Sequence, residues 1–116
     1  MRFDSIIIGG GPAGLTAAYF LAIKGHKVTV YDAMPRMGGM LRYGIPEYRL
    51  PKKVLEKEIS GIKKLGVLMK NNVSIGKDVS FEEIRKNSDA VLIAAGAWKA
   101  AGIGCPGEEL SGVISG

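Results

Sequence analysis

Cysteine and histidine are nearly absent from this chain of 116 residues, which contains one of each. A single thiol, Cys105, cannot form an internal disulfide, and alone it cannot hold an iron–sulfur cluster or a structural zinc ion. Cys105 precedes a proline in a glycine-rich stretch and has no obvious activating partner. His26 follows Gly25 in an expected surface turn. We therefore expect neither a metal centre nor thiol chemistry.

Long hydrophobic runs are also missing. No apolar run approaches the roughly 20 residues of a membrane span, and the N-terminus enters a strand without the pattern of a signal peptide. These features predict a cytoplasmic protein that does not bind a membrane. With 116 residues and a 47% hydrophobic composition, the chain can form one domain with a real core. That length is small for a complete nucleotide-dependent enzyme.

Acidic residues are outnumbered, and the net charge is +5. The excess lies mainly between residues 42 and 64, where glutamates are interleaved among Arg42, Arg49, Lys52, Lys53, Lys57, Lys63 and Lys64. The pattern favours a solvated amphipathic helix with ion-paired turns. The alternative is electrostatic attraction of phosphates or of an acidic protein partner such as a ferredoxin. No nucleic-acid-binding module is recognisable, so we expect no nucleic-acid partner.

Apolar segments alternate along the chain with helical patterns. Strands are predicted at residues 3–8, 27–31, 67–70 and 89–95, with another possible at 72–75. Helices are predicted at 13–24, from about 51 to 65, and from a capping box at Ser80 to about 86. Residues 33–50 are predicted to form a long irregular loop, which is usually functional. The alternation indicates an α/β protein with a Rossmann-like, doubly wound parallel sheet. The continuous apolar run at 89–95 is typical of a strand in the buried centre of such a sheet.

The first strand runs into the glycine motif Gly9-Gly-Gly-Pro-Ala-Gly14. In a dinucleotide-binding turn, Gly9 allows the tight bend, Gly11 lets the backbone approach a pyrophosphate, and Gly14 lets the helix lie close to the sheet. The helix N-terminus then offers N–H groups and a positive dipole end to phosphates. The second strand ends in Asp32, which is placed to bind a ribose.

Ligands of parallel sheets bind outside the carboxyl ends of the strands. The glycine turn, Asp32 and the pair Ala95-Gly96 all follow strands and should therefore surround one crevice. Asp32 would repel the 2′-phosphate of NADP, which disfavours NADP in this crevice. On these physical grounds NAD and FAD both remain open.

A resemblance to known flavoproteins decides between them. The segment from Gly9 to Ala18 is similar to the FAD fingerprint of flavoproteins with two dinucleotide-binding domains. The segment Arg36-Met-Gly-Gly-Met-Leu-Arg-Tyr-Gly-Ile-Pro-Glu-Tyr-Arg-Leu-Pro51 resembles the signature of the glutamate synthase small (beta) subunit family. Residues 89–97 and 106–113 resemble later parts of the same family. The family comprises FAD- and NAD(P)H-dependent oxidoreductases, so the resemblance implies that FAD is the cofactor here.

The resemblance also implies roles for individual residues. Gly9, Gly11, Pro12, Ala13 and Gly14 would flank the FAD pyrophosphate, Asp32 would bind the adenosine ribose, and Val73 would contact the adenine. The loop that begins at Ala33 would add the glycine pair Gly38 and Gly39, with Arg36 either at a phosphate or the adenine or simply solvated. Gly39 and Leu41 would line the ribityl and flavin region, and Gly44, Ile45, Pro46 and Leu50 would pack near the isoalloxazine. Ala95, Gly96 and Ala97 would close the pyrophosphate side.

The family usually has an iron–sulfur domain before this unit and an NADPH-binding fold after it. We therefore expect residues 1–116 to be the FAD-binding part of such an oxidoreductase, with NAD(P)H bound only in a longer parent protein. That parent would pass electrons from NAD(P)H through FAD to another acceptor, such as an iron–sulfur or ferredoxin-type partner. The alternatives are a dinucleotide-binding module without turnover and an NAD-binding dehydrogenase domain. No side chain is expected to act as a catalytic acid, base or nucleophile.

Overall fold

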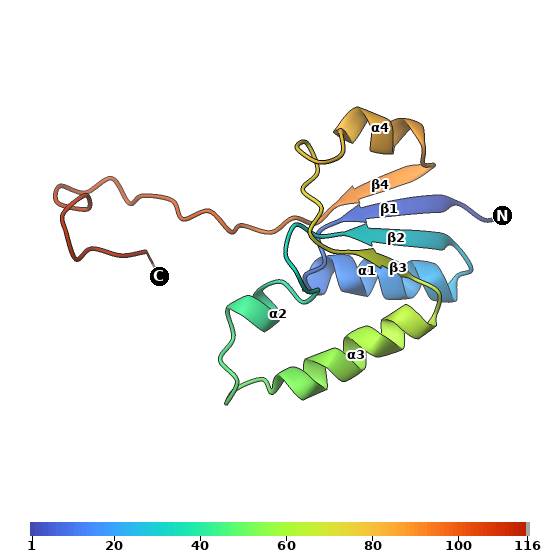
Figure 1. Ribbon diagram of the computed structural model, residues 1–116, viewed down its shortest axis with the longest axis horizontal. Coiled ribbons are helices and arrows are strands. Elements are labelled where there is room, and N and C mark those ends of the chain that lie inside the picture. Colours follow the sequence, from blue (N-terminus) through green and yellow to red (C-terminus); the bar gives the residue numbers. More distant parts are fainter. Residues whose placement is uncertain (116) are drawn as a thin grey trace.

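A four-stranded parallel sheet organises the computed structural model, which describes residues 1–115 (Figure 1). Strands and helices follow one another along the chain, as the sequence predicts. The elements are β1 (Asp4–Ile8), α1 (Pro12–Ile23), β2 (Lys27–Tyr31), α2 (Met40–Tyr43), α3 (Lys52–Lys64), β3 (Leu68–Lys70), α4 (Phe81–Lys86) and β4 (Ala90–Ile93).

The strands lie in the order β3-β2-β1-β4, and every neighbouring pair is parallel. In this register Ile7 of β1 is aligned with Val30 of β2 and with Leu92 of β4. All four strands therefore end at the same edge of the sheet. The glycine turn after β1, Asp32 after β2 and the chain after β4 meet there, and the predicted α/β fold with a parallel sheet is confirmed.

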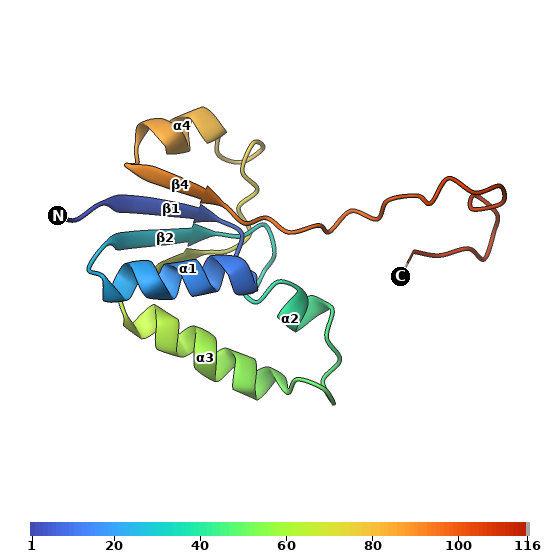
Figure 2. The same cartoon turned by 180° about the vertical axis from the view of Figure 1, so that it is seen from behind.

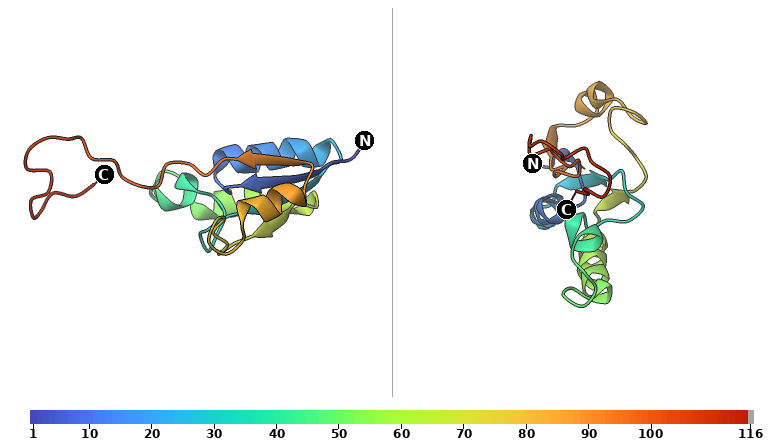
Figure 3. Two further views of the ribbon diagram at one scale, coloured as in Figure 1. Left: turned by 90° about the horizontal axis from the view of Figure 1, so that it is seen from above. Right: turned by 90° about the vertical axis from the view of Figure 1, so that its left-hand side faces the viewer.

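The hydrophobic core lies between the sheet and the helices α1 and α3. Figure 2 shows α1 in front of the strands with α3 alongside it, and Figure 3 shows α4 on the opposite side of the sheet. Three strand residues, Ile7, Val28 and Val30, are at most 1% exposed. Around them pack Leu15 and Ala18 from α1, Met37 from the following loop, Leu55 and Ile59 from α3, and Val67.

Local sequence signals explain where the helices begin and end. Pro12 starts α1, since proline suits the first turn of a helix, where its missing N–H is not needed. The Ser80 hydroxyl accepts a hydrogen bond from the N–H of Glu83 at 3.1 Å, which confirms the predicted cap of α4. Gly25 and Gly66 follow α1 and α3 with positive φ, the usual way to end a helix.

Two predicted segments differ from the structure. Residues 33–50 are not wholly irregular, because they contain α2 and the turns around it. Residues 72–75 form no strand; an isolated bridge pairs Ile75 with Val79. The Asp78 carboxylate instead accepts the N–H of Ser74 at 2.8 Å, which favours a turn over an extended strand.

The prediction that the last strand lies in the buried centre of the sheet is wrong for residues 1–115. β4 is an edge strand, and Leu92 and Ile93 are 43% and 63% exposed. A further apolar surface lies on α1, where Tyr19, Phe20 and Ile23 are also about half exposed. A continuous apolar run indicates that both faces of a strand suit burial, but it does not say which residues cover them.

The glycine turn is crowded by the backbone on two sides. A Cβ on Gly14 would lie 1.9 Å from the carbonyl oxygen of Gly9, and a Cβ on Gly9 would lie 2.0 Å from the carbonyl oxygen of Ala94. Gly9 also has a φ of 112°, which side-chain-bearing residues rarely adopt. Glycine at these positions therefore lets β1, α1 and the chain after β4 approach closely.

Beyond β4 the chain leaves the sheet as an extended segment that ends far from the N-terminus (Figure 1). Its aliphatic side chains are exposed, with Ile103 at 84% and Ile114 at 88%. Among the helices of the part described here, none is both long enough and apolar enough to cross a membrane.

We expect Gly14→Ala to destabilise the fold by about 1–3 kcal/mol, since the new methyl group must push α1 away from the Gly9 carbonyl. Urea denaturation followed by circular dichroism measures this change. The matched control is Gly61→Ala on α3, where a Cβ would meet nothing within 4 Å. Because alanine favours a helix interior over glycine, the control should gain about 0.5–1 kcal/mol. Equal midpoints for the two variants would contradict the close approach.

Candidate functional site

Two clefts open at the carboxyl edge of the sheet. The strand-end cleft has a volume of about 370 Å³ and is lined by residues after β1 and β2 and by residues 73–75. The helix cleft has a volume of about 240 Å³ and is lined by the N-terminus of α1, by Gly39 and Met40, and by residues 94–98. The clefts share Gly9, Asp32, Ala95 and Trp98. The two clefts are therefore adjacent, and together they form the crevice that the sequence predicts around these residues.

The helix cleft has the features of a phosphate-binding site. Gly11 is the N-cap of α1, and no side chain caps this helix end. The first N–H groups of a helix have no partner within it, and the helix dipole adds a positive potential there. No acidic residue lies in the first turn of α1. The N-terminus of α1 is thus free to bind an anion through its backbone.

The second glycine pair completes this cleft. The N–H of Gly38 donates a 2.7 Å hydrogen bond to the carbonyl of Gly10. A Cβ on Gly39, where φ is 54°, would lie 2.7 Å from the Cα of Gly11. The two glycine motifs therefore contact each other through backbone atoms. Gly11 itself has an extended backbone, and a Cβ there would lie at an ordinary 3.7 Å from Gly39.

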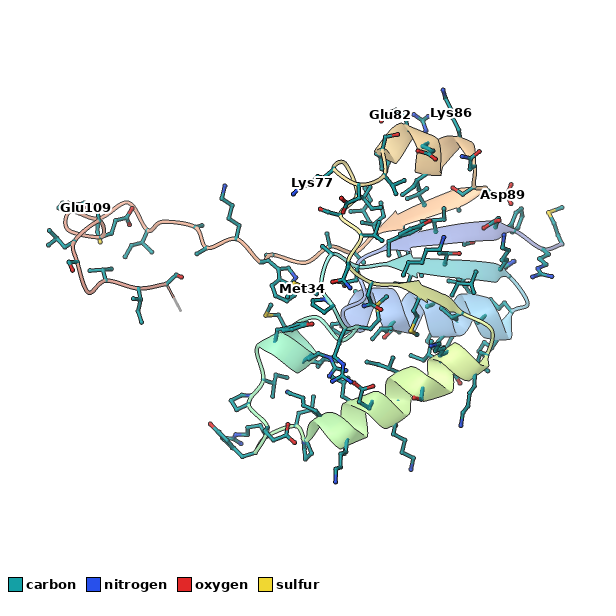
Figure 4. The ribbon with its side chains drawn as sticks, viewed as in Figure 1. Met34, Lys77, Glu82, Lys86, Asp89 and Glu109 are labelled. Atoms are coloured by element: carbon teal, nitrogen blue, oxygen red, sulfur yellow. The ribbon has the colours of Figure 1, made fainter. Side chains whose placement is uncertain are left out.

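Asp32 joins the glycine turn to the start of the loop after β2. Its carboxylate accepts the N–H of Gly10 at 2.6 Å and the N–H of Met34 at 2.8 Å. Met34, labelled in Figure 4, lies at the same edge of the sheet. Asp32 is the one charged residue among those that line the two clefts. A bound phosphate would therefore depend on backbone N–H groups rather than on lysine or arginine.

Most of the predicted site residues meet at these clefts. Those that line them are Gly9, Gly11, Pro12, Ala13, Asp32, Ala33, Gly39, Val73, Ala95, Gly96 and Ala97. Those that lie outside are Gly14, which packs on the turn, together with Arg36, Gly38, Leu41, Gly44, Ile45, Pro46 and Leu50. Arg36 lines a separate cleft beside α3, with its guanidinium 3.6 Å from Glu56.

Part of the basic cluster is used inside the fold. The buried Arg42 guanidinium pairs with Glu56 and donates to the carbonyl of Met37 at 2.7 Å. The Lys52 ammonium donates to the carbonyls of Leu41 and Ile45, at 3.0 and 2.6 Å. These contacts tie α2 and the loops on either side of it to α3. The two cations therefore stabilise the site's framework and do not face a ligand.

Several cleft residues escaped the sequence prediction: Ile8, Tyr31, Met34, Met40, Ser74, Ile75, Ala94 and Trp98. Tyr31 and Ile8 are the last residues of their strands. A rule that adds the last residue of each predicted strand to the site would have identified them. Trp98 was more difficult to place, since no periodicity indicates where the chain turns after Gly96.

The parallel sheet, the glycine turn at a helix N-terminus and the acidic residue after β2 define a dinucleotide-binding α/β protein. Comparison with known families agrees. Residues 3–115 match the family "Pyridine nucleotide-disulphide oxidoreductase". The chain belongs to this family.

Named relatives confirm the predicted resemblance. The chain is 50% identical over 103 residues to the NADP(+)-dependent formate dehydrogenase subunit beta of Moorella thermoacetica, covering 89% of this chain and 15% of that protein. It is 44% identical over 109 residues to the glutamate synthase [NADPH] small chain of Azospirillum brasilense, covering 94% and 23%. The chain thus spans less than a quarter of the length of either relative.

Solved structures share the fold. Mycobacterium tuberculosis FprA in complex with NADPH superposes with a TM-score of 0.85 at 27% identity, over 98% of this chain and 27% of the FprA chain. The prediction of a Rossmann-type oxidoreductase fold is therefore confirmed.

We expect Asp32→Asn to lower the free energy of unfolding by about 1–3 kcal/mol, because one of the two backbone N–H groups loses its acceptor. The matched control is Glu58→Gln, at an exposed position on α3, which should change stability by less than about 0.5 kcal/mol. Chemical denaturation of both variants gives the comparison. An Asp32→Asn midpoint equal to that of the control would show that the carboxylate does not hold the glycine turn and the loop after β2 together.

Proposed function

We propose that this chain binds FAD in the crevice and is the flavin-binding part of an NAD(P)H-dependent oxidoreductase. The observation that carries the proposal is Gly11. Its backbone angles, φ −81° and ψ −171°, suit any residue, and the protein leaves room for a Cβ. Neither strain nor crowding within the protein requires glycine there, whereas a ligand in the helix cleft does.

The residues present fit a dinucleotide with two phosphates. We assign the adenosine to the strand-end cleft, where Asp32 is placed for the ribose and Val73 for the adenine. We assign the pyrophosphate to the helix cleft, beside Gly11, Pro12 and Ala13. Asp32 disfavours a 2′-phosphate at this position, which supports FAD over NADP. FAD, when bound, supplies the hydride- and electron-transfer chemistry, and the chain's own residues bind and orient it.

The residues that we assign to the ribityl chain and the isoalloxazine are proposed from the family resemblance. Gly39 lines the helix cleft and is placed for the ribityl chain. Leu41, Gly44, Ile45, Pro46 and Leu50 lie on and after α2, outside the clefts. We propose that they pack near the isoalloxazine where it extends beyond the helix cleft, with Gly38 and Gly14 shaping the backbone. Arg36 is assigned to the surface, since it is 66% exposed and pairs with Glu56.

We propose that electron transfer from NAD(P)H requires protein segments in addition to residues 1–115. The relatives from Moorella thermoacetica and Azospirillum brasilense carry NADP(+) or NADPH in their names and are a subunit and a small chain of larger enzymes. We propose that NAD(P)H binds in a separate unit and that electrons pass through FAD to an iron–sulfur or ferredoxin-type partner. A dinucleotide-binding module without turnover is the second candidate, because a single dinucleotide crevice is found among residues 1–115.

Gly11→Ala is expected to weaken FAD binding about tenfold or more, since the methyl group intrudes where the pyrophosphate is placed. Stability should change by less than about 1 kcal/mol, the scale of a helix N-cap effect. Equilibrium dialysis with FAD measures affinity, and urea denaturation measures stability.

Gly61→Ala is the matched control and should bind FAD as the wild type does, since it adds the same methyl group in open space on α3. Wild-type protein that binds NAD but not FAD would overturn the flavin assignment. Sustained NADPH oxidation by this chain alone would instead overturn the proposed separation of the two nucleotide sites.

A further inference from the structure

The single tryptophan of the chain, Trp98, lies where the two clefts meet. It lines both the strand-end cleft and the helix cleft, and 45% of it remains exposed. A tryptophan that only completes a core would be covered by the protein itself. Trp98 instead presents a large apolar surface to a crevice lined mostly by backbone and small side chains.

Tyr43, the last residue of α2, holds Trp98 at this position. The two rings meet edge to face, with their centroids 5.5 Å apart and their planes at 61°. The Tyr43 hydroxyl in turn accepts the N–H of Arg36 at 3.2 Å. The pair therefore connects three segments around the crevice: the loop after Asp32, α2, and the chain after β4. Aromatic pairs of this geometry stabilise a defined ring orientation.

Gly96 allows the tryptophan to reach the crevice. Its φ of 72° lies in the left-handed region, and the indole atoms Cδ1 and Nε1 are 3.7 Å from the position of a Cβ there. The indole edge thus faces Gly96 across an ordinary contact distance.

We propose, on the basis of the proposed function, that Trp98 is a cofactor-binding residue positioned by Tyr43. Its indole forms the wall that the two clefts share and contacts the adenosine diphosphate half of the bound dinucleotide. This half is the part that would extend from the strand-end cleft to the helix cleft. Aromatic side chains against a base or sugar contribute specificity for the planar, partly apolar ligand.

Affinity for FAD tests the contribution of the ring. Trp98→Ala should raise the Kd for FAD about tenfold, the effect typical of losing one aromatic contact. Trp98→Phe retains a ring and should raise it about threefold or less. The matched control is Tyr48→Ala, which removes an aromatic side chain that is 83% exposed and lines neither cleft. Its Kd should equal that of the wild type.

Tryptophan fluorescence tests the contact without any variant. ADP-ribose is the probe, because it contains the adenosine diphosphate half and lacks the flavin, which would quench Trp98 by energy transfer at a distance. Saturating ADP-ribose should shift the emission of Trp98 and reduce its quenching by acrylamide. AMP, which lacks the second phosphate, should have a smaller effect at equal concentration.

The outcomes separate this proposal from the previous one. If the wild type binds FAD while ADP-ribose leaves the emission and the acrylamide quenching of Trp98 unchanged, the tryptophan contact is wrong and the flavin assignment stands. If ADP-ribose changes the fluorescence but FAD does not bind, the flavin assignment is wrong and the contact stands. If Trp98→Ala fails to fold, the wild-type fluorescence result and the Trp98→Phe affinity decide.

Discussion

The close approach of backbone atoms around Gly9 is the constraint on which the rest of the site depends. Without a side chain there, the chain leaving β4 comes down beside the turn after β1, and the N–H of Ala94 donates to the carbonyl of Ile8 at 2.7 Å. Gly14 lets α1 approach the same turn from the other side. The ends of three elements are thereby placed around one crevice. A larger side chain at either glycine would separate them, and the helix N-terminus would no longer point into that crevice.

Asp32 is the one charged side chain that lines the crevice. Each carboxylate oxygen of Asp32 accepts one backbone N–H, from the glycine turn and from the following loop. These N–H groups partly neutralise its negative charge. The cations Arg42 and Lys52, although close in sequence to the loop, bind carbonyls and a glutamate that hold α2 against α3. A phosphate bound at this crevice would thus depend on backbone dipoles, which are fixed in place by the fold, whereas flexible basic side chains would lose conformational freedom on binding it.

The sequence predicts what depends on local patterns. Residues adjacent in sequence determine the apolar runs of β1 and β2, the glycine fingerprint and the cap at Ser80. The structure has all of these features at the expected positions. Two features could not be found this way. The helix α2 is four residues long, too short for periodicity or propensity to reveal, and contacts made through Arg42 and Lys52 hold it in place. Trp98 meets Tyr43 only because the fold brings together segments that are distant in sequence. Long-range contacts of this kind leave no local signal.

The two edges of the sheet differ in how they would treat another polypeptide. β3 is three residues long and carries Lys70, and a short, charged edge discourages pairing with a further strand. β4 presents Ala90, Val91, Leu92 and Ile93, with neither a charge nor a proline to protect its outer backbone groups. The sheet therefore has one direction in which it can grow by strand addition. A strand added to this sheet would therefore pair with β4 rather than with β3.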